Sequence, residues 1–161
     1  MKRILSAAVL AVAVLAGCAP PFPKDLLGKL TPDAAYADLQ RSPERFSGAL
    51  VMVGGTIVET KNQKEGTRIE VLQKPLDSQG RPLMTDETGG RFIVHVAQFL
   101  DAAIYHRGRS VTVIAEVAGV EVHPLGEIEY GYPALSARDV HLWSPYQGPR
   151  FSFGIGVYRG F

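Results

Sequence analysis

Segments in which apolar and polar residues alternate dominate the chain after residue 48, and they constrain its fold more strongly than any other feature. In residues 67–74, Ile69 and Val71 lie on one side, and Arg68 and Glu70 lie on the other. This two-residue period is typical of β-strands with one buried face, and it predicts about six strands in total. The segments are residues 49–60, 67–74, 91–96, 110–118, 121–130 and, in two short pieces, 132–136 and 139–143.

Glycine residues indicate where the predicted sheet bends and turns. Gly54 and Gly55 lie inside the first strand, where paired glycines indicate a bulge or a sharp bend. Gly119 is expected to form the turn between residues 110–118 and 121–130. Strands and helices do not alternate as a parallel sheet would require. We therefore predict a mainly β protein: a small antiparallel OB-like β-barrel of about five to six strands with one or two short helices.

The short helices are expected ahead of the strands. Thr31, followed by a proline, is a favourable N-cap for a helix that continues to about residue 41. Residues 42–44 repeat this start for a second and shorter helix, which Gly48 ends.

The N-terminus has the three zones of a secretory signal. Lys2 and Arg3 give a basic start, and residues 4–15 form an apolar run with Ser6 as its only polar side chain. As a helix, this run would span about 18 Å and would not cross the roughly 30 Å hydrocarbon core of a bilayer. We therefore predict export by a cleaved signal rather than a transmembrane helix.

Cys18 is the only cysteine in the chain, so an internal disulfide is excluded. It follows Leu15, Ala16 and Gly17, which are small or aliphatic residues of the kind that precede a lipoprotein cleavage site. We predict cleavage between Gly17 and Cys18, a covalent diacylglycerol and an N-acyl chain on Cys18, and no other cofactor. Two acyl chains are enough for stable anchoring. Ala19 favours attachment to the outer membrane. We expect the domain to face the periplasm.

The chain is predicted to have four parts. Residues 1–17 are the signal, 18–30 a lipidated proline-rich tether that stays extended, 31–145 the barrel domain, and 146–161 a tail rich in glycine and aromatic residues. The 17 lysines and arginines include two in the signal, so the remaining 15 nearly balance the 16 aspartates and glutamates. This balance argues against nucleic acid as a partner.

The tail alternates with the period of a strand. Phe151, Phe153, Ile155 and Val157 lie on one side, and small residues occupy most of the other. Such a segment can add to the edge of a sheet, its own or a partner's. A disordered tail is the alternative interpretation.

No recognisable catalytic or metal-binding set is present in the sequence. His95, His106, His123 and His141 lack metal-binding spacing and are predicted to be isolated surface or core residues. No serine lies in the Gly-x-Ser-x-Gly arrangement of a hydrolase. We therefore predict that the protein is not an enzyme and has no metal site.

Two polar spots are candidate partner-binding sites. Asp77 and Arg81 could present a charged pair, although a turn with Gly80 at positive φ is the favoured interpretation. Arg107 and Arg109 form a basic spot that could contact anionic lipid or lipopolysaccharide head groups, because guanidinium groups match phosphate. A solvated turn, neutralised by outward-facing glutamates of the next hairpin, is the alternative for the second spot.

Short stretches spread over most of the chain share the residues, order and spacing of a known family. The stretches are residues 43–48, 53–57, 75–78, 80–82, 90–92, 99–101 with Tyr105, 108–113, 126–127 with Tyr130, 132–133 and 142–143. Together they resemble the Slp (starvation-inducible) family of outer-membrane lipoproteins. The resemblance implies an envelope lipoprotein with a β-barrel body. It implies no enzyme activity and assigns no catalytic residue.

The function predicted from these features is that of a lipid-anchored outer-membrane lipoprotein. Its expected role in the cell envelope is structural or adaptor-like and non-enzymatic, with a connection to stress. The expected partners are the membrane, through the lipid, and an envelope protein. Two alternatives stay open: a carrier or sensor of a small ligand within the barrel, and a cryptic metal-dependent hydrolase. A filled interior would argue against the carrier.

Overall fold

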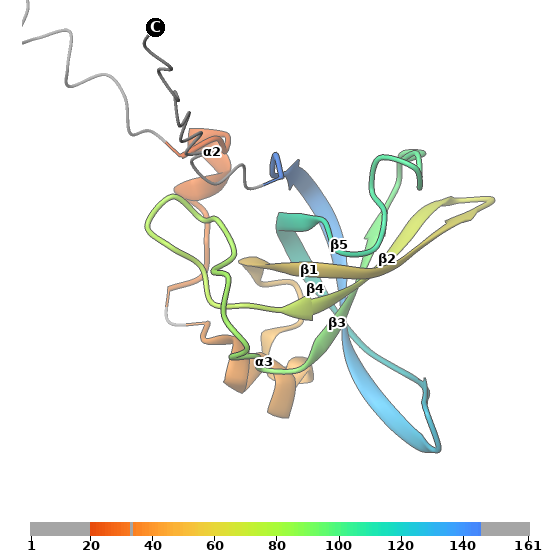
Figure 1. The fold of residues 1–161 in the computed structure, drawn as a ribbon. Coiled ribbons are helices and arrows are strands. Elements are labelled where there is room, and N and C mark those ends of the chain that lie inside the picture. Colours follow the sequence, from red (N-terminus) through yellow and green to blue (C-terminus); the bar gives the residue numbers. More distant parts are fainter. Residues whose placement is uncertain (1–19, 33, 146–161) are drawn as a thin grey trace, which may run out of the picture.

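The computed structural model describes residues 20–32 and 34–145, in which one sheet of five strands closes into a barrel (Figure 1). The strands are β1 (Leu50–Gln63), β2 (Gly66–Gln73), β3 (Arg91–Val96), β4 (Ser110–Leu125) and β5 (Ile128–Leu142). Around the ring they follow the order β1-β2-β3-β5-β4, and β4 pairs with β1. The predicted fold class, a small and mainly β barrel with short helices, is confirmed.

One strand pairing differs from the predicted antiparallel pattern. β3 and β5 run parallel, with Ile93 opposite Ala134 and His95 opposite Ser136. The other four pairings are antiparallel. Alternation of apolar residues is the same for strands of either direction, so the sequence pattern could not reveal this pairing.

The paired glycines lie where β1 passes from one neighbouring strand to the other. The first half of β1 pairs with β4, and the second half, from Gly55 onward, pairs with β2. A methyl group on Gly54 or Gly55 would collide with the backbone of these neighbours. The register shift in β1 falls slightly later, between Ile57 and Glu59. The glycines therefore permit the close approach of strands that closure of the barrel requires.

The predicted turn at Gly119 is wrong. β4 continues through this residue to Leu125, and the chain turns at Gly126 and Glu127. Gly119 has a φ of 135° and lies at a register shift between β4 and β5, so it forms an irregularity within a long strand. The four short segments predicted after residue 109 are therefore two long strands. Beyond Gly119 they form an arm that projects from the barrel (Figure 1).

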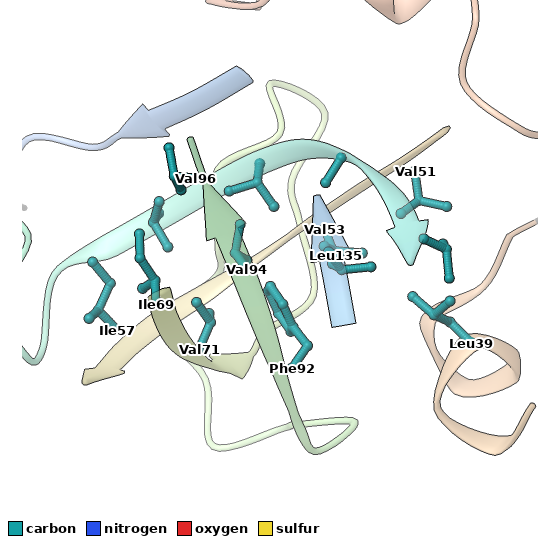
Figure 2. Packing of buried hydrophobic residues seen from close by; sticks show 14 residues of the cluster. Leu39, Val51, Val53, Ile57, Ile69, Val71, Phe92, Val94, Val96 and Leu135 are labelled. Atoms are coloured by element: carbon teal, nitrogen blue, oxygen red, sulfur yellow. The ribbon is translucent and has the colours of Figure 1, made fainter. Parts of the chain in front are cut away.

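The inward faces of the strands fill the barrel with aliphatic and aromatic side chains. Val71, Phe92 and Leu135 are fully buried in one cluster, to which all five strands contribute. Leu39, from the helix before β1, joins this cluster beside Val51 at one end of the barrel (Figure 2). Burial of each large apolar side chain contributes about 1.5–3 kcal/mol, so this interior is the main source of stability.

Two short helical segments precede β1, and the first begins later than predicted. α3 (Tyr36–Arg41) follows Ala35 as its N-cap rather than Thr31. The backbone N–H of Thr31 instead bonds the carbonyl of Leu50, at 2.8 Å. The predicted second helix forms as a 3-10 helix, η2 (Pro43–Phe46).

The segment predicted to be an extended tether contains a helix and packs on the barrel. α2 (Lys24–Leu27) follows Pro23 at its N-cap, so the prolines precede the helix and do not interrupt it. The apolar residues of this segment cover the outer face of β1 and β4. They are Phe22, Leu26, Leu27 and Leu30, which pack with Leu50, Met52, Ile114 and Trp143. The prediction that this segment would not form a helix is wrong, and the chain is held on the barrel from Phe22 onward.

Several predictions concern residues outside the described ranges. They are the signal over residues 1–17, the cleavage and lipidation site at Gly17 and Cys18, and the tail over residues 146–161. Within the described ranges, no helix is long and apolar enough to span a bilayer.

Candidate functional site

The loop between β2 and β3 contains a tight turn that Asp77 organises. Its carboxylate accepts hydrogen bonds from the backbone N–H groups of Gln79, at 2.8 Å, and Arg81, at 2.9 Å. The backbone N–H of Gly80 donates to the Asp77 carbonyl, and Gly80 has a φ of 81°. The predicted turn, with an aspartate cap and a glycine at positive φ, is confirmed.

A buried chain of hydrogen bonds fastens this turn to the barrel. Thr112 points outward from β4 and is nevertheless fully buried, and its hydroxyl donates to the Gly80 carbonyl at 2.6 Å. The indole Nε1–H of Trp143 donates to the same hydroxyl oxygen at 2.9 Å. The turn, β4 and the end of β5 are therefore held as one unit. Sequence reasoning missed this unit because its members lie 31 and 32 residues apart.

Arg81 extends from the turn toward the end of β5. Its guanidinium carbon lies 5.3 Å from the centre of the Trp143 ring, which is within the range of a cation–π contact. One of its terminal nitrogens donates to the Ser144 carbonyl at 2.9 Å. The Asp77 carboxylate bonds backbone N–H groups, while the Arg81 guanidinium contacts residues 143–144.

Arg109 lies close to the same tryptophan. Its two terminal nitrogens donate to the carbonyls of Ile104, at 3.1 Å, and Trp143, at 3.0 Å. Its Nε is buried and has no hydrogen-bond partner among the described residues. Arg107, two residues earlier, is exposed.

These side chains line one surface cleft of about 540 Å³, which we name the Arg81 cleft. Its lining comes from the loop before β3, the loop before β4 and the end of β5. The residues are Asp77, Arg81, Pro82, Leu83, Met84, Gly108, Arg109, Ser110, Trp143, Ser144 and Pro145. Of the four predicted partner-binding residues, Asp77, Arg81 and Arg109 therefore meet in one place. Arg107 is adjacent to Gly108 at the margin of the cleft.

The N-terminal segment borders the Arg81 cleft through Phe22. The Phe22 ring lies 6.4 Å from the Trp143 ring and 5.6 Å from the His141 ring, edge-on to both. A methyl group on Gly80 would approach the Phe22 ring to 2.8 Å, so the turn also packs against this side chain. Trp143 could have been noticed as the only tryptophan in the chain, whereas no sequence signal indicated Phe22.

A second polar cluster, the His95 triad, consists of His95, Glu121 and His123. The Nε2 atom of His95 lies 2.5 Å from one Glu121 carboxylate oxygen, and Nε2 of His123 lies 2.8 Å from the other. The prediction of isolated histidines is wrong for these two, because β5 lies between β3 and β4 and brings both to one face. Glu121, one of the glutamates of the hairpin expected to neutralise the basic spot at Arg107 and Arg109, therefore pairs with histidines instead.

Glu121 has a lowered pKa. Burial raises the pKa of this carboxyl group, but hydrogen bonds from His123 and His95, together with their charges, outweigh burial and hold it below the usual 4.5. A carboxylate with a lowered pKa adds stability above its usual pKa, and this stability is lost as the pH falls through the lower folded value.

We expect Glu121→Gln to lower the free energy of unfolding by about 1 kcal/mol near pH 7, because it removes the ionised acceptor of two hydrogen bonds. Below pH 4.5 the difference from wild type should shrink, since protonation removes the same acceptor. Urea unfolding between pH 3 and pH 7 measures both effects. Glu129→Gln, on the exposed part of the same arm, should leave stability unchanged. An equal loss at pH 3 and pH 7 for Glu121→Gln would contradict the prediction.

The His95 triad is held together by hydrogen bonds, because the Nε2 atom of each histidine contacts an oxygen of the Glu121 carboxylate. Across residues 20–32 and 34–145, no three His, Cys, Asp or Glu side chains are arranged to hold a metal ion. His141 lies elsewhere, with its ring 4.5 Å from that of Trp143.

The closed barrel, its packed N-terminal segment and the Arg81 cleft define a small β-barrel domain, and sequence comparison assigns its family. Residues 15–155 match the outer membrane lipoprotein Slp family, and the chain belongs to this family. The match includes the predicted lipidation site and the whole barrel. The family predicted from the sequence is therefore confirmed, and membership assigns the protein to the outer membrane.

Three relatives are similar over most of the chain. The uncharacterised lipoprotein YeaY of Escherichia coli (strain K12) is 29% identical over 70% of this chain and 58% of its own length. Outer membrane protein Slp of the same organism is 23% identical over 89% of this chain and 77% of its own. An uncharacterised protein of Haemophilus influenzae (strain ATCC 51907 / DSM 11121 / KW20 / Rd) is 30% identical over 81% of this chain and 70% of its own length. The chain thus spans less than two thirds of YeaY.

Proposed function

We propose that this protein is a lipid-anchored module of the outer membrane, attached through Cys18 and facing the periplasm, with a structural or adaptor role and no enzymatic activity. Membership of an outer membrane lipoprotein family supports the location. The sequence before Cys18 supports the anchor, because small and aliphatic residues precede the only cysteine. The proposal also includes a connection with stress, and the family resemblance is its only support.

The observation that carries this proposal is the packing of the segment that follows Cys18. Phe22 is 5% exposed and α2 lies on the barrel surface, so the polypeptide is fastened to the domain four residues after the predicted lipid. A lipid at that position would therefore attach the whole barrel firmly to a membrane. The apolar residues of this segment pack on the outside of the barrel, and the segment supplies no strand to the closed sheet.

The filled interior favours a structural or adaptor role over a small-ligand carrier. Inward-facing side chains such as Ile69, Val71 and Val94 are completely buried within one cluster. A carrier of a small ligand would need an enclosed cavity of several hundred Å³ among such side chains. The larger hollows in the described part of the chain lie instead at the surface, with the Arg81 cleft as an example.

Metabolic labelling with a palmitate analogue tests the anchor. We expect Cys18→Ser to abolish labelling completely and to leave an uncut precursor, because no other thiol can accept the diacylglycerol. Ala19→Ser, at the neighbouring position, is the matched control and should keep the label. Labelled Cys18→Ser protein would refute the anchor.

The non-enzymatic part of the proposal has its own test. A reaction catalysed by the purified full chain, and abolished by one side-chain change in the His95 triad or the Arg81 cleft, would overturn it. We expect no such reaction.

A further inference from the structure

We propose that the Arg81 cleft and the loops beside it form the surface that lies against the bilayer, where arginine side chains contact the phosphates of anionic lipids and Leu83 and Met84 enter the interface. This inference rests on the proposed anchor at Cys18 and adds the orientation of the barrel. It also gives a role to the basic spot at Arg107 and Arg109.

The length of chain between the anchor and the barrel restricts this orientation. Phe22 is buried against Trp143, and Cys18 precedes it by four residues. Four extended residues span at most about 14 Å. A lipid on Cys18 therefore keeps the membrane surface within about 14 Å of Phe22, and the face that surrounds this residue must lie closest to the lipid.

Phe22 lies at the edge of the Arg81 cleft. Its ring is edge-on to Trp143, which lines the cleft, and it packs against the turn that carries Arg81. Figure 1 shows α2 at one end of the molecule and the tip of the β4–β5 arm at the far end. The same short segment that holds the anchor thus brings the cleft, and not the arm, toward the bilayer.

The charges of this face suit an anionic surface. Arg81 and Arg109 line the cleft, Arg107 is exposed beside it, and Lys74 lines the adjoining hollow. The carboxylates in the same two hollows are Asp77 and Asp86. The four cations of this face therefore outnumber the two carboxylates of these hollows. Guanidinium groups match the phosphates of lipid head groups in shape and charge.

Apolar side chains on this face are exposed without a partner in the described chain. Met84 is 84% exposed and Leu83 is 44% exposed, and both line the cleft next to the arginines. Ile104, whose carbonyl binds Arg109, is 52% exposed. Exposed apolar residues beside cations are typical of surfaces that lie in a membrane interface. The aliphatic parts of the arginine side chains can lie along such residues while the guanidinium groups stay at the level of the lipid phosphates.

A fluorescent label at residue 84 tests the orientation in the full lipidated chain. The lipid occupies the thiol of Cys18, so Met84→Cys supplies the one reactive thiol for an environment-sensitive dye. On vesicles of phosphatidylethanolamine and phosphatidylglycerol we expect the emission of this dye to shift to shorter wavelength. The matched control is Val122→Cys on the arm, where the native side chain is 58% exposed and the dye should report water. Flotation of the vesicles shows separately whether the chain is anchored.

Two results would overturn the orientation. One is an unchanged emission at residue 84 in protein that floats with the vesicles, and the other is an equal shift at residue 122. Failure to float would instead count against the anchor. The mature chain, produced without residues 1–17 and with Cys18→Ser, covers that case, since its cleft face should still bind phosphatidylglycerol vesicles weakly and in a salt-sensitive manner.

Substitution of exposed arginines tests the charge contribution in this lipid-free chain. Arg107→Gln should weaken binding to phosphatidylglycerol vesicles about fivefold. Arg45→Gln is the matched control, because Arg45 is also exposed but lies in η2, which contacts α3. In Figure 1, α3 lies away from α2. Equal weakening by both substitutions, or no salt-sensitive binding at all, would refute a docking role for the cleft face.

Discussion

Replacing Gly55 with alanine is expected to destabilise the barrel by more than about 3 kcal/mol, enough to prevent folding in a marginally stable domain. The added methyl group would overlap the Leu72 carbonyl oxygen and would lie 2.9 Å from the Cα of Gln73. Both are backbone atoms of the paired strand β2, so no side-chain rotation can relieve the contact. Relief would require β1 and β2 to separate at the point where β1 also pairs with β4.

Urea unfolding followed by circular dichroism measures this effect, and Gly131→Ala is the matched control. Gly131 also lies in a strand, and a methyl group there would meet its nearest neighbour, the Val120 side chain, at 4.0 Å. Its stability should stay within about 0.5 kcal/mol of wild type. A Gly55→Ala protein as stable as Gly131→Ala would show that closure of the barrel does not depend on close approach at this residue.

Replacing Thr112 with valine is expected to destabilise the protein by about 2–3 kcal/mol and to change the surroundings of Trp143. Valine has nearly the shape of threonine, so the packing is preserved while two hydrogen bonds are lost. The carbonyl of Gly80 would lose its donor and the indole N–H of Trp143 would lose its acceptor, both beside a fully buried side chain. Buried polar groups without partners are more costly than missing hydrogen bonds at the surface.

Trp143 reports this change directly, because it is the only tryptophan in the chain. We expect the native emission of Thr112→Val to shift, together with the loss of stability in urea. Thr67→Val is the control: Thr67 is 2% exposed and bonds Asn62, Gln98 and Leu100, away from the Arg81 cleft. It should lower stability while leaving the native emission unchanged. A shift of equal size in both variants would contradict the assigned hydrogen-bonded unit.

The Arg81 cleft depends on this unit for its shape. Thr112 fixes the turn through Gly80, and the turn directs Arg81 onto the Trp143 ring. Thr112→Val should therefore also weaken the salt-sensitive binding to phosphatidylglycerol vesicles that we predict for the cleft face. We therefore expect the hydroxyl group of Thr112 to contribute both to the stability of the barrel and to the arrangement of the cleft face.

Local patterns predicted much of the barrel correctly. The strand over residues 91–96 has the observed bounds, and the alternation of Val111 and Val113 identifies the inward face of β4. The turn at Asp77 and Gly80 was also predictable, since an aspartate cap and a glycine at positive φ act over four residues. In each case the information lies within one strand or one turn.

Other predictions failed where distant parts of the chain decide the outcome. Glycine is typical of turns, yet β4 continues through Gly119 because β5 supplies hydrogen-bond partners on both sides of the register shift. Residues 20–30 resemble a tether by their prolines, yet Phe22 and the leucines of α2 find an apolar surface on β1 and β4. The prolines all precede α2 and do not oppose its helical turn, so burial of these apolar side chains is free to hold the segment on the barrel.

The sequence by itself determined the family, the class of fold and the single residue suited to carry a lipid, because each depends on residue types and spacing along the chain. Only the tertiary structure decided which side chains meet. Asp77, Arg81, Arg109 and Trp143 converge because closure of the sheet brings the ends of three separate segments together. The tertiary structure also decided where Phe22 packs, against a barrel formed by residues far along the chain, and the proposed orientation on the membrane rests on that contact.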